Sequence, residues 1–461
     1  MDINQYLVIG MFITFMLLMF TGFPVAWVLA GVGVAFAVIG YFADLYFDAM
    51  TGLDFLTLGL VVNRIYKIMD NWVLVALPTF IFMGIMLDRS GVAERLMRSM
   101  QALFGKVRGG LAITVTMIGI ILAASTGIIG ASVVLLGLMS LPAMQKQGYH
   151  MPLALGTIAG AGTLGILIPP SIMLVIMADQ LGISVGDLFM GAVVPGLMLG
   201  FLYLLYIFII GLLKPENAPL AGDREPFDWR LVLRVFRDIF PPALLIFAVL
   251  GSIFAGIATP TEASGIGALG ATLLAVFNQR FSFKVLKESV EGTMRTSGYI
   301  FAIFIGATCF SLVLRELGGD EVIESALTGL PFGPYGIVAF ILFIVFLLGF
   351  MLDWIEITLI VLPLLAPVVS TLGFDIDGGG VVDNPTLVWF VMLIAVALQT
   401  SFLTPPVGFA LFYLKGVCPK EVRMEHIYRG VIPFIVLQLV GLLIIACWPE
   451  LVLWLPILAY G

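Results

Sequence analysis

Gly162-Thr163-Leu164-Gly165-Ile166-Leu167-Ile168-Pro169-Pro170-Ser171 places two adjacent prolines in the middle of the apolar stretch 151–181. The arrangement recurs in the second half, where Gln399-Thr400-Ser401-Phe402-Leu403-Thr404-Pro405-Pro406-Val407-Gly408 interrupts the apolar stretch 386–417. Each proline pair removes backbone donors and breaks a helix, and hydrocarbon cannot replace the lost hydrogen bonds. Interrupted membrane helices at matching positions of two halves are typical of the binding site of a secondary transporter. The two stretches therefore predict a transporter with two broken helices.

The composition predicts a multi-pass membrane protein built from helices. Hydrophobic residues make up 61% of the chain and charged residues 11%, whereas soluble domains carry about 25% charged residues. Three scattered cysteines and two histidines form neither a disulfide framework nor a metal-ligand spacing, so we expect no cofactor. Residues 6–20 are apolar but follow no basic segment, so we expect them to stay in the membrane rather than to be cleaved as a signal peptide.

The basic residues predict an orientation. Two apolar stretches, 109–143 and 334–372, are too long for one span and break near the middle, and we interpret them as re-entrant hairpins. With a periplasmic N-terminus, the loops on the cytoplasmic side then hold 19 of the 22 Lys and Arg residues, as the positive-inside rule requires. The remaining spans are predicted at 5–21, 24–43, 73–88, 151–181, 189–213, 240–257, 261–278, 296–314, 386–417 and 428–449. The outer loops keep only Arg64, Lys67 and Arg315.

This assignment divides the chain into two inverted halves. Residues 1–213 and 240–461 each hold five spans and one hairpin, with a cytoplasmic linker at 214–239. An odd number of spans turns the second half upside down, which is the inverted-topology repeat of alternating-access transporters. The motif Gly91-Val92-Ala93-Glu94 resembles Gly318-Gly319-Asp320-Glu321 at the corresponding position. The fold expected is an all-α membrane protein with two re-entrant hairpins and two broken helices; the alternative is two unrelated helical bundles.

Two further segments are predicted to lie at the membrane surface rather than to span it. In 92–104, apolar residues recur at helical spacing with arginines on the other faces, and 281–294 shows a similar pattern with lysines. These segments are either arms that join a moving unit to a fixed one or simple surface helices.

The hairpin turns, 123–132 and 349–358, are predicted to face the double-proline breaks. Non-helical backbone at membrane depth is tolerated where it lines a polar cavity or binds ions. Unwound carbonyls, with hydroxyls from Thr126, Thr163, Ser401 and Thr404, suit sodium better than a divalent metal, which needs several carboxylates. The N-termini of the half-helices offer partial positive charge to an anionic substrate.

Asp353 and Glu356 are the only acidic residues in the second hairpin turn. A carboxylate inside the membrane is a functional-site hypothesis, so these residues could ligate a cation or carry a coupling proton. Alternatively, Asp353 caps the second half-helix and Glu356 hydrogen-bonds its backbone. The sequence leaves both interpretations open.

Across its full length the chain resembles the large membrane subunit of the tripartite ATP-independent periplasmic (TRAP) transporters. The most specific marks are 162–171, Thr259-Pro260-Thr261-Glu262-Ala263 and 404–408, in order and at matching distances. The second hairpin and 398–404 are more similar to the mannitol/chloroaromatic or 2-oxoacid type than to the sialic acid type. The resemblance implies an elevator mechanism in a bacterial inner membrane, with sodium as the coupling ion. It also implies a small four-helix membrane subunit and a periplasmic binding protein that delivers an organic acid.

The resemblance also suggests site residues. One sodium would lie between the first hairpin and the first break, the second between the second hairpin and the second break, and the substrate between the tips. The predicted sodium ligands are Thr126, Gly127, Gly165, Ile168, Gly349, Asp353, Ser401 and Thr404. The predicted substrate contacts are Thr126, Thr163, Pro170, Glu356, Thr404 and Pro406. One departure concerns Ile128 and Ile129, which stand where family members often have hydroxyl groups.

Other functions remain as alternatives. A stand-alone organic anion carrier, driven by sodium or protons, needs no partner subunits. An intramembrane enzyme would use Asp353 and Glu356 as a catalytic pair, but no nucleophile and base accompany them. An ATP-driven pump would need a P-loop, which does not occur in the sequence. Nothing in the sequence predicts a nucleic-acid partner.

Overall fold

The computed structural model describes residues 2–126, 129–220 and 228–461, and these residues form helices joined by short loops without a strand. The first half contains α1 (Ile3–Met19), α2 (Val25–Phe47), α3 (Phe55–Asp70), η1 (Trp72–Val75), α4 (Ala76–Arg89), α5 (Val92–Phe104), α6 (Gly110–Thr126), α7 (Ile129–Lys146), α8 (Met151–Thr163), η2 (Leu164–Ile166), α9 (Ile172–Leu181) and α10 (Val185–Leu213). The second half contains α11 (Trp229–Phe254), α12 (Pro260–Phe277), α13 (Phe283–Glu316), α14 (Gly319–Thr328), α15 (Pro334–Leu348), α16 (Trp354–Glu356), η3 (Ile357–Val361), α17 (Leu362–Thr371), α18 (Pro385–Leu403), α19 (Phe409–Val417), α20 (Met424–Cys447) and α21 (Glu450–Tyr460). The all-α class is confirmed.

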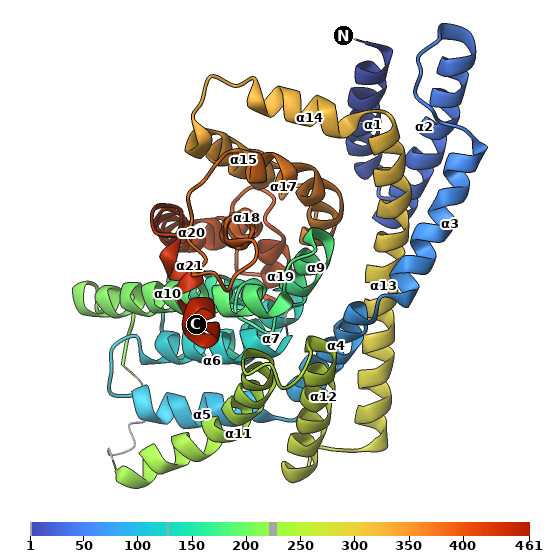
Figure 1. Cartoon of the computed structure of the whole chain (residues 1–461). Coiled ribbons are helices and arrows are strands. Elements are labelled where there is room, and N and C mark those ends of the chain that lie inside the picture. The colour runs from blue at the N-terminus through green and yellow to red at the C-terminus, as the bar shows by residue number, and fades with distance from the viewer. Residues whose placement is uncertain (1, 127–128, 221–227) are drawn as a thin grey trace.

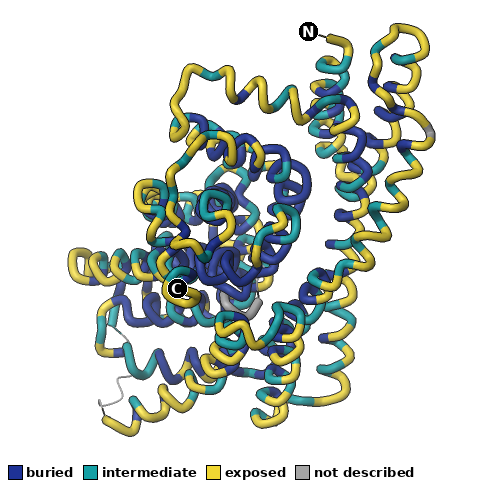
Figure 2. The backbone as a smooth tube through the Cα atoms, in the orientation of Figure 1, coloured by how far each residue is buried: buried dark blue, intermediate teal, exposed yellow. Residues whose placement is uncertain are grey.

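The helices form two groups, which Figure 1 shows side by side. The scaffold group consists of α1–α4, α12 and α13, in which α13 packs along α2 and α4 and α12 packs along α4. The core group contains both hairpins and both broken helices, with α8 packed on α6, α7 and α20 and α18 packed on α15 and α20. Figure 2 shows that the buried residues concentrate in the middle of the core group.

Glycines bring the main scaffold helices together. A Cβ atom on Gly306 of α13 would lie 2.4 Å from the Ala26 carbonyl oxygen of α2, and one on Gly33 would lie 2.9 Å from the Cys309 sulfur. Small residues let membrane helices approach closely and gain dispersion contacts that lipid would otherwise provide. The close contact of α2 with α13 therefore depends on glycine at these two positions.

The predicted hairpins and breaks are present in the core group. Helices α6 and α7 form the first hairpin, and α15 with α16, η3 and α17 forms the second. The broken helices run as α8, η2 and α9 and as α18 and α19, and the peptide bonds Pro169–Pro170 and Pro405–Pro406 are both cis. The first hairpin contacts α19 and the second hairpin contacts α9, so each hairpin packs on the broken helix of the other half.

Most predicted spans correspond to helices, and nine helices among the described residues are long and apolar enough to cross a membrane. The predicted surface helix at 92–104 is α5, whose apolar face packs on α6 and α11. The separate surface helix predicted at 281–294 is wrong, because α13 continues from Phe283 to Glu316 as one helix of 34 residues. The sequence predicts an outer loop between residues 44 and 72, but the structure has the helix α3 there.

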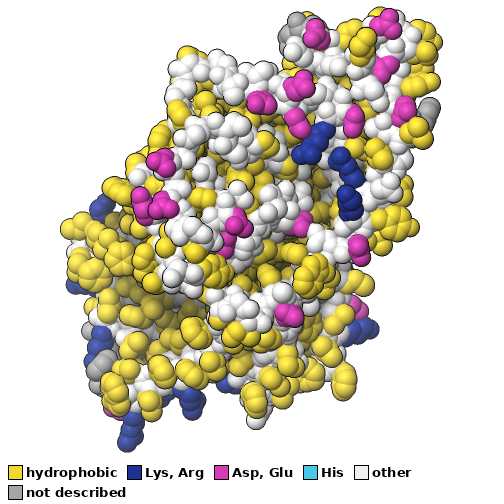
Figure 3. All heavy atoms as spheres, viewed as in Figure 1, with side chains coloured by type: hydrophobic (Ala, Val, Ile, Leu, Met, Phe, Trp, Pro, Cys, Tyr) yellow, Lys and Arg dark blue, Asp and Glu magenta, His cyan; other side chains and the backbone are white. Residues whose placement is uncertain are grey.

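The charges separate along the molecule. Figure 3 shows most Asp and Glu side chains in the upper half and most Lys and Arg side chains toward the lower edge, apart from one basic group in the upper half. The N-terminus lies at the upper end in Figure 1. The glycines of the two similar motifs, Gly91 and Gly318, precede α5 and α14 with φ values of 73° and 80°. The periplasmic N-terminus and the division into two repeats remain predictions.

Candidate transport site

One cavity lies where both hairpins, the second broken helix and the scaffold meet. We call it the tip cavity, and its volume is about 240 Å³. Helices α7 and α19 both begin at this cavity, because Gly130 and Phe409 line it close to their N-termini. The lining residues from the core group are Ile129, Gly130, Met351, Asp353, Trp354, Glu356, Phe409 and Tyr413, and those from the scaffold group are Met19, Val25 and Tyr299.

Glu356 is the most unusual residue of the tip cavity. Its side chain is 1% exposed, and neither carboxylate oxygen has a hydrogen-bond partner among the described residues. Burying a charge without a partner is strongly unfavourable, so such a group calls for a proton or a bound cation. Among the described residues, no hydrogen bond within the usual distance and angle limits joins the Glu356 carboxylate to the backbone of its own turn, and both interpretations of this residue remain predictions.

Asp353 plays a different structural part at the same cavity. It is the N-cap residue of α16, and the Trp354 backbone nitrogen donates a hydrogen bond of 2.8 Å to its Oδ1 atom. This contact agrees with the capping interpretation. Asp353 and Glu356 both line the tip cavity, so the capping contact of one Asp353 oxygen is compatible with a cation contact.

Two tyrosines complete the tip cavity and were missed in the sequence analysis. Tyr413 of α19 packs on the start of α7, the second helix of the first hairpin. A Cβ atom on Gly130 would lie 3.0 Å from the Tyr413 Cζ atom. Tyr299 reaches the cavity from the scaffold helix α13. Tyr413 lies one turn after Phe409 and close behind the second break, and this position in the sequence could have indicated that it belongs to the site. The sequence around Tyr299 contains no comparable indication.

The predicted residues around the second break come together. A Cβ atom on Gly349 would lie 2.6 Å from the Ser401 Oγ atom, so the end of α15 touches α18 at this point. Ser401 donates a hydrogen bond of 2.8 Å to the Phe346 carbonyl oxygen, and Thr404 donates one of 2.6 Å to the Thr400 carbonyl oxygen. Hydroxyl and carbonyl oxygens of two helix ends thus gather between the second hairpin and α18.

The first break is enclosed in helix packing. Thr163 donates a hydrogen bond of 2.9 Å to the Gly160 carbonyl oxygen and accepts one of 3.4 Å from the Gln399 side-chain amide. The amide oxygen of Gln399, another residue missed in the sequence analysis, has no partner among the described residues. This pair connects the two broken helices directly.

The other predicted residues lie farther from the tip cavity or cannot be placed. Gly165, Ile168 and Pro170 are buried around the first break, where Ile168 packs against Gly196 of α10. Pro406 is exposed, and its carbonyl oxygen accepts a hydrogen bond of 3.1 Å from Tyr428. Thr126 ends α6, but its side chain and all of Gly127 lie outside the described residues.

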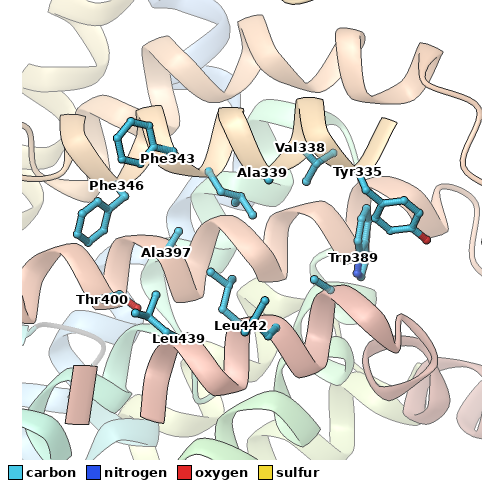
Figure 4. A pocket seen from close by; sticks show the side chains of 13 residues that line it. Tyr335, Val338, Ala339, Phe343, Phe346, Trp389, Ala397, Thr400, Leu439 and Leu442 are labelled. Carbon is cyan, nitrogen blue, oxygen red and sulfur yellow. The ribbon is translucent and has the colours of Figure 1, made fainter. Parts of the chain in front are cut away.

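A separate groove between α15, α18 and α20 is apolar. Figure 4 shows Tyr335 and Trp389 at one end and Phe346 with Thr400 at the other. Its volume is about 360 Å³ and no charged residue lines it. The groove suits a hydrocarbon chain and offers nothing to neutralise an organic anion.

Comparison with known proteins agrees with this architecture. The family model described as the DctM component of the tripartite ATP-independent periplasmic transporters matches residues 12–451. The C4-dicarboxylate TRAP transporter large permease protein DctM of Pseudomonas aeruginosa is 32% identical, over 85% of this chain and 88% of that protein. Its counterpart from Vibrio cholerae is 31% identical, over 85% of this chain and 87% of that protein. The sialic acid TRAP transporter large permease protein SiaM of Vibrio cholerae is 26% identical, over 96% of this chain and 97% of that protein.

A solved structure confirms the fold class. The Alcanivorax borkumensis YdaH transporter superimposes with a TM-score of 0.53, covering 83% of this chain and 88% of that chain. The sequence identity is 12%, so this similarity concerns the fold alone.

Proposed function

The chain belongs to the DctM component family of the tripartite ATP-independent periplasmic transporters, and on this premise we propose that it takes up a small organic anion together with sodium. As a member of this family it is a multi-pass membrane transport component rather than an enzyme. The observation that carries the proposal is the tip cavity, where two helices begin and two carboxylates lie between the core group and the scaffold group.

The substrate we propose is a small carboxylate, possible examples being a C4-dicarboxylate or a 2-oxoacid. Among the described residues no Lys or Arg lines the tip cavity, so the proposal is that other groups hold the anion. The N-termini of α7 and α19 supply free backbone N–H groups and the positive end of a helix dipole. The phenol groups of Tyr299 and Tyr413 add two hydrogen-bond donors.

Asp353 and Glu356 give a physical reason for coupling. Two carboxylates and an anionic substrate repel one another strongly in a cavity of low dielectric constant. A cation must therefore neutralise this charge before the anion can bind. We propose that sodium does so, and that a proton on Glu356 is the alternative coupling species.

We propose one sodium site at each of the two double-proline breaks. Gly349, Ser401 and Thr404 already lie together at the second break, and hydroxyl and carbonyl oxygens are the ligands that hard cations prefer. The first site, with Thr126, Gly127, Gly165 and Ile168, rests on the resemblance alone. Thr163 and Pro170 stay predicted substrate contacts, although both lie in the packing around the first break.

The motion we propose is an elevator in which the core group slides along α13. The tip cavity has walls from both groups, so sliding would carry a bound anion past the scaffold. The partners proposed are a small four-helix membrane subunit and a periplasmic substrate-binding protein in a bacterial inner membrane. The alternative is a stand-alone carrier of the same anion.

The test is uptake into proteoliposomes that contain this chain with its small membrane subunit, with the binding protein and its ligand outside. An inward sodium gradient is compared with a matched potassium gradient, each with and without binding protein. Uptake that needs both sodium and binding protein supports the proposal. Sodium-driven uptake without binding protein supports the stand-alone carrier, and uptake that is equal with potassium contradicts sodium coupling.

A further inference from the structure

A second cavity, larger than the tip cavity, lies between the scaffold and the core group. Its volume is about 410 Å³. Helices α3 and α13 form one wall, while α9, η3 and α17 form the other. We call it the basic vestibule, and its lining residues are Arg64, Lys67, Ile68, Gln180, Phe304, Ala307, Thr308, Ser311, Arg315, Leu359, Ile360, Pro363 and Leu364.

Helical spacing explains why the polar side chains face one another. Arg64 and Lys67 are three residues apart on α3 and therefore project from the same face of that helix. On α13, Thr308, Ser311 and Arg315 follow at intervals of three and four residues and form a single polar stripe. The two stripes meet across the cavity, which places three cationic groups and two hydroxyl groups around one space.

The charge of the vestibule contrasts with its surroundings. Arg64, Lys67 and Arg315 are the basic residues that the predicted topology leaves outside, and Figure 3 shows one Lys and Arg group in the acidic upper half, over α3 and α13. Burial, and then the nearby charge of Arg315, lower the pKa of Arg64, while Glu316 has the opposite effect. The Arg315 Nε atom lies 3.6 Å from Asp320 Oδ2, in a pair that is about half exposed. Surface pairs of this kind are weak, so Arg315 keeps donors for another anion.

The vestibule adjoins the tip cavity. Leu359 and Ile360 line the vestibule and follow Glu356 within one turn of the second hairpin. On the scaffold side, Tyr299 lies at the tip cavity and Thr308 at the vestibule, about 13 Å farther along the same helix. Phe304, which also lines the vestibule, lies between Tyr299 and Thr308 along α13.

We propose that the basic vestibule is an anion-capture site, where a carboxylate substrate binds before it reaches the tip cavity. The inference extends the proposed uptake of an organic anion. Guanidinium groups hold carboxylates through paired, charge-assisted hydrogen bonds, which two arginines and a lysine can offer here. A cleft lined by charges of one sign also raises the local concentration of the opposite ion by about 10-fold to 1,000-fold.

The test measures the electrostatic preference of the vestibule without transport. Ser311→Cys is introduced together with Cys309→Ala, Cys418→Ser and Cys447→Ser. The rate at which the new cysteine at position 311 reacts with the anionic reagent sulfonatoethyl methanethiosulfonate is measured, and so is its rate with the cationic trimethylammonioethyl analogue. The ratio of the anionic to the cationic rate reports the electrostatic preference. We expect this ratio to fall about tenfold when Arg64→Gln, Lys67→Gln and Arg315→Gln are combined.

The matched control is Lys284→Gln, Lys287→Gln and Arg295→Gln. These three substitutions remove the same charge from the N-terminal half of α13, and we expect them to leave the ratio unchanged. An equal ratio in the parent and in the vestibule triple variant would overturn the inference. So would a failure of both reagents to reach Ser311→Cys and, in a second variant, Thr308→Cys.

The outcome is separable from the fate of the proposed function. A ratio that depends on the three basic residues, in a protein that shows no sodium-driven uptake, would keep the capture site and contradict the symport. Sodium-driven uptake, together with a ratio that does not change in the vestibule triple variant, would support the symport and contradict the capture site.

Discussion

The two double-proline breaks have the same sequence pattern but different surroundings. Residues 164–171 of the first break are all buried, and α10 closes over them through Gly196. In the second break, Thr404, Pro405 and Val407 are half-buried and Pro406 is exposed. The second break also lies beside the half of the molecule that supplies Asp353 and Glu356 to the tip cavity. The repeated motif is therefore fully buried in the first half and partly exposed in the second half.

The difference in burial between the two breaks indicates where substitutions should change the sodium dependence of uptake. Hydroxyl groups at the first break already donate to carbonyl oxygens inside a dry helix junction, as Ser171 does to the Ile166 carbonyl oxygen at 2.5 Å. At the second break Ser401 and Thr404 also donate to carbonyl oxygens, but Thr404 is only half-buried and adjoins the exposed part of the break. We therefore expect substitutions at the first break to act on stability and those in the second half to act on sodium dependence.

The largest effect is expected from Glu356→Gln. Removing a buried charge that engages a cation costs about 3–5 kcal/mol of that interaction, so sodium-driven uptake should fall about a hundredfold or more. Stability should not decrease, because the unpartnered charge disappears. Uptake and thermal unfolding are measured on the same preparation, with Asp187→Asn, a buried carboxyl group of the first half, as the control. Full uptake by Glu356→Gln would remove this residue from the coupling mechanism.

Gly349→Ala should have the next largest effect. The new Cβ atom would lie 2.6 Å from Ser401 Oγ, and such overpacking costs about 1–3 kcal/mol. Because this cost falls on the proposed ion site, the sodium concentration for half-maximal uptake should rise about tenfold.

Gly162→Ala is the matched substitution in the first half, where the added Cβ atom would lie 2.5 Å from Val133 Cγ2. It should lower the unfolding temperature without changing sodium dependence. The double variant Gly349→Ala with Ser401→Gly should recover packing but not sodium affinity. Recovery of both would show that Ser401 is no ligand.

A smaller effect is expected when single hydroxyl groups are removed. Thr404→Ala should weaken sodium activation about threefold to tenfold, since one lost ligand or hydrogen bond is worth about 1 kcal/mol. Ser171→Ala should lower stability by about 1 kcal/mol for the same reason and leave sodium activation intact. Sodium titrations of uptake for the two variants decide the comparison, and identical curves would contradict the assignment to the second break.

The smallest effect concerns the starts of two scaffold helices, α12 and α2. Helix α12 begins with a capping box, in which Thr259 accepts from the Glu262 backbone nitrogen and Glu262 accepts from Thr259. Helix α2 begins after Pro24 without a side-chain cap. Thr259→Ala should reduce the free energy of unfolding by about 1 kcal/mol without affecting the sodium dependence of uptake. A change in sodium dependence would give this motif a role beyond capping.

The parts of the fold that composition and local backbone chemistry determine could be predicted from the sequence. Hydropathy identified the spans, and the proline pairs located both breaks. Helix α3 was missed because its apolar residues are interleaved with Asn63, Arg64 and Lys67, which lower its hydropathy. The continuity of α13 was missed because its first turns carry lysines that resemble those of a surface helix. In both cases tertiary packing, which hydropathy does not contain, determines the outcome.

The site was harder to predict than the fold. The pairing of Gly349 with Ser401 followed from the family resemblance, and the structure brings these residues together. Tyr299 and Gln399 were not found, because each reaches its partners across the interface between elements far apart in the chain. Thr163 and Pro170 are buried in helix packing, and their contact with the substrate stays a prediction, because sequence position alone does not reveal which side of a break is covered.

The length of α13 also limits how the molecule can move. The helix has 34 residues, which corresponds to a rod of about 51 Å. It carries Lys284 and Lys287 near one end and Arg315 near the other, so displacement along the membrane normal would pull a cation into hydrocarbon at a cost of about 3 kcal/mol or more. In the proposed elevator, this cost would keep α13 at a fixed depth across the membrane while the core group moves past it.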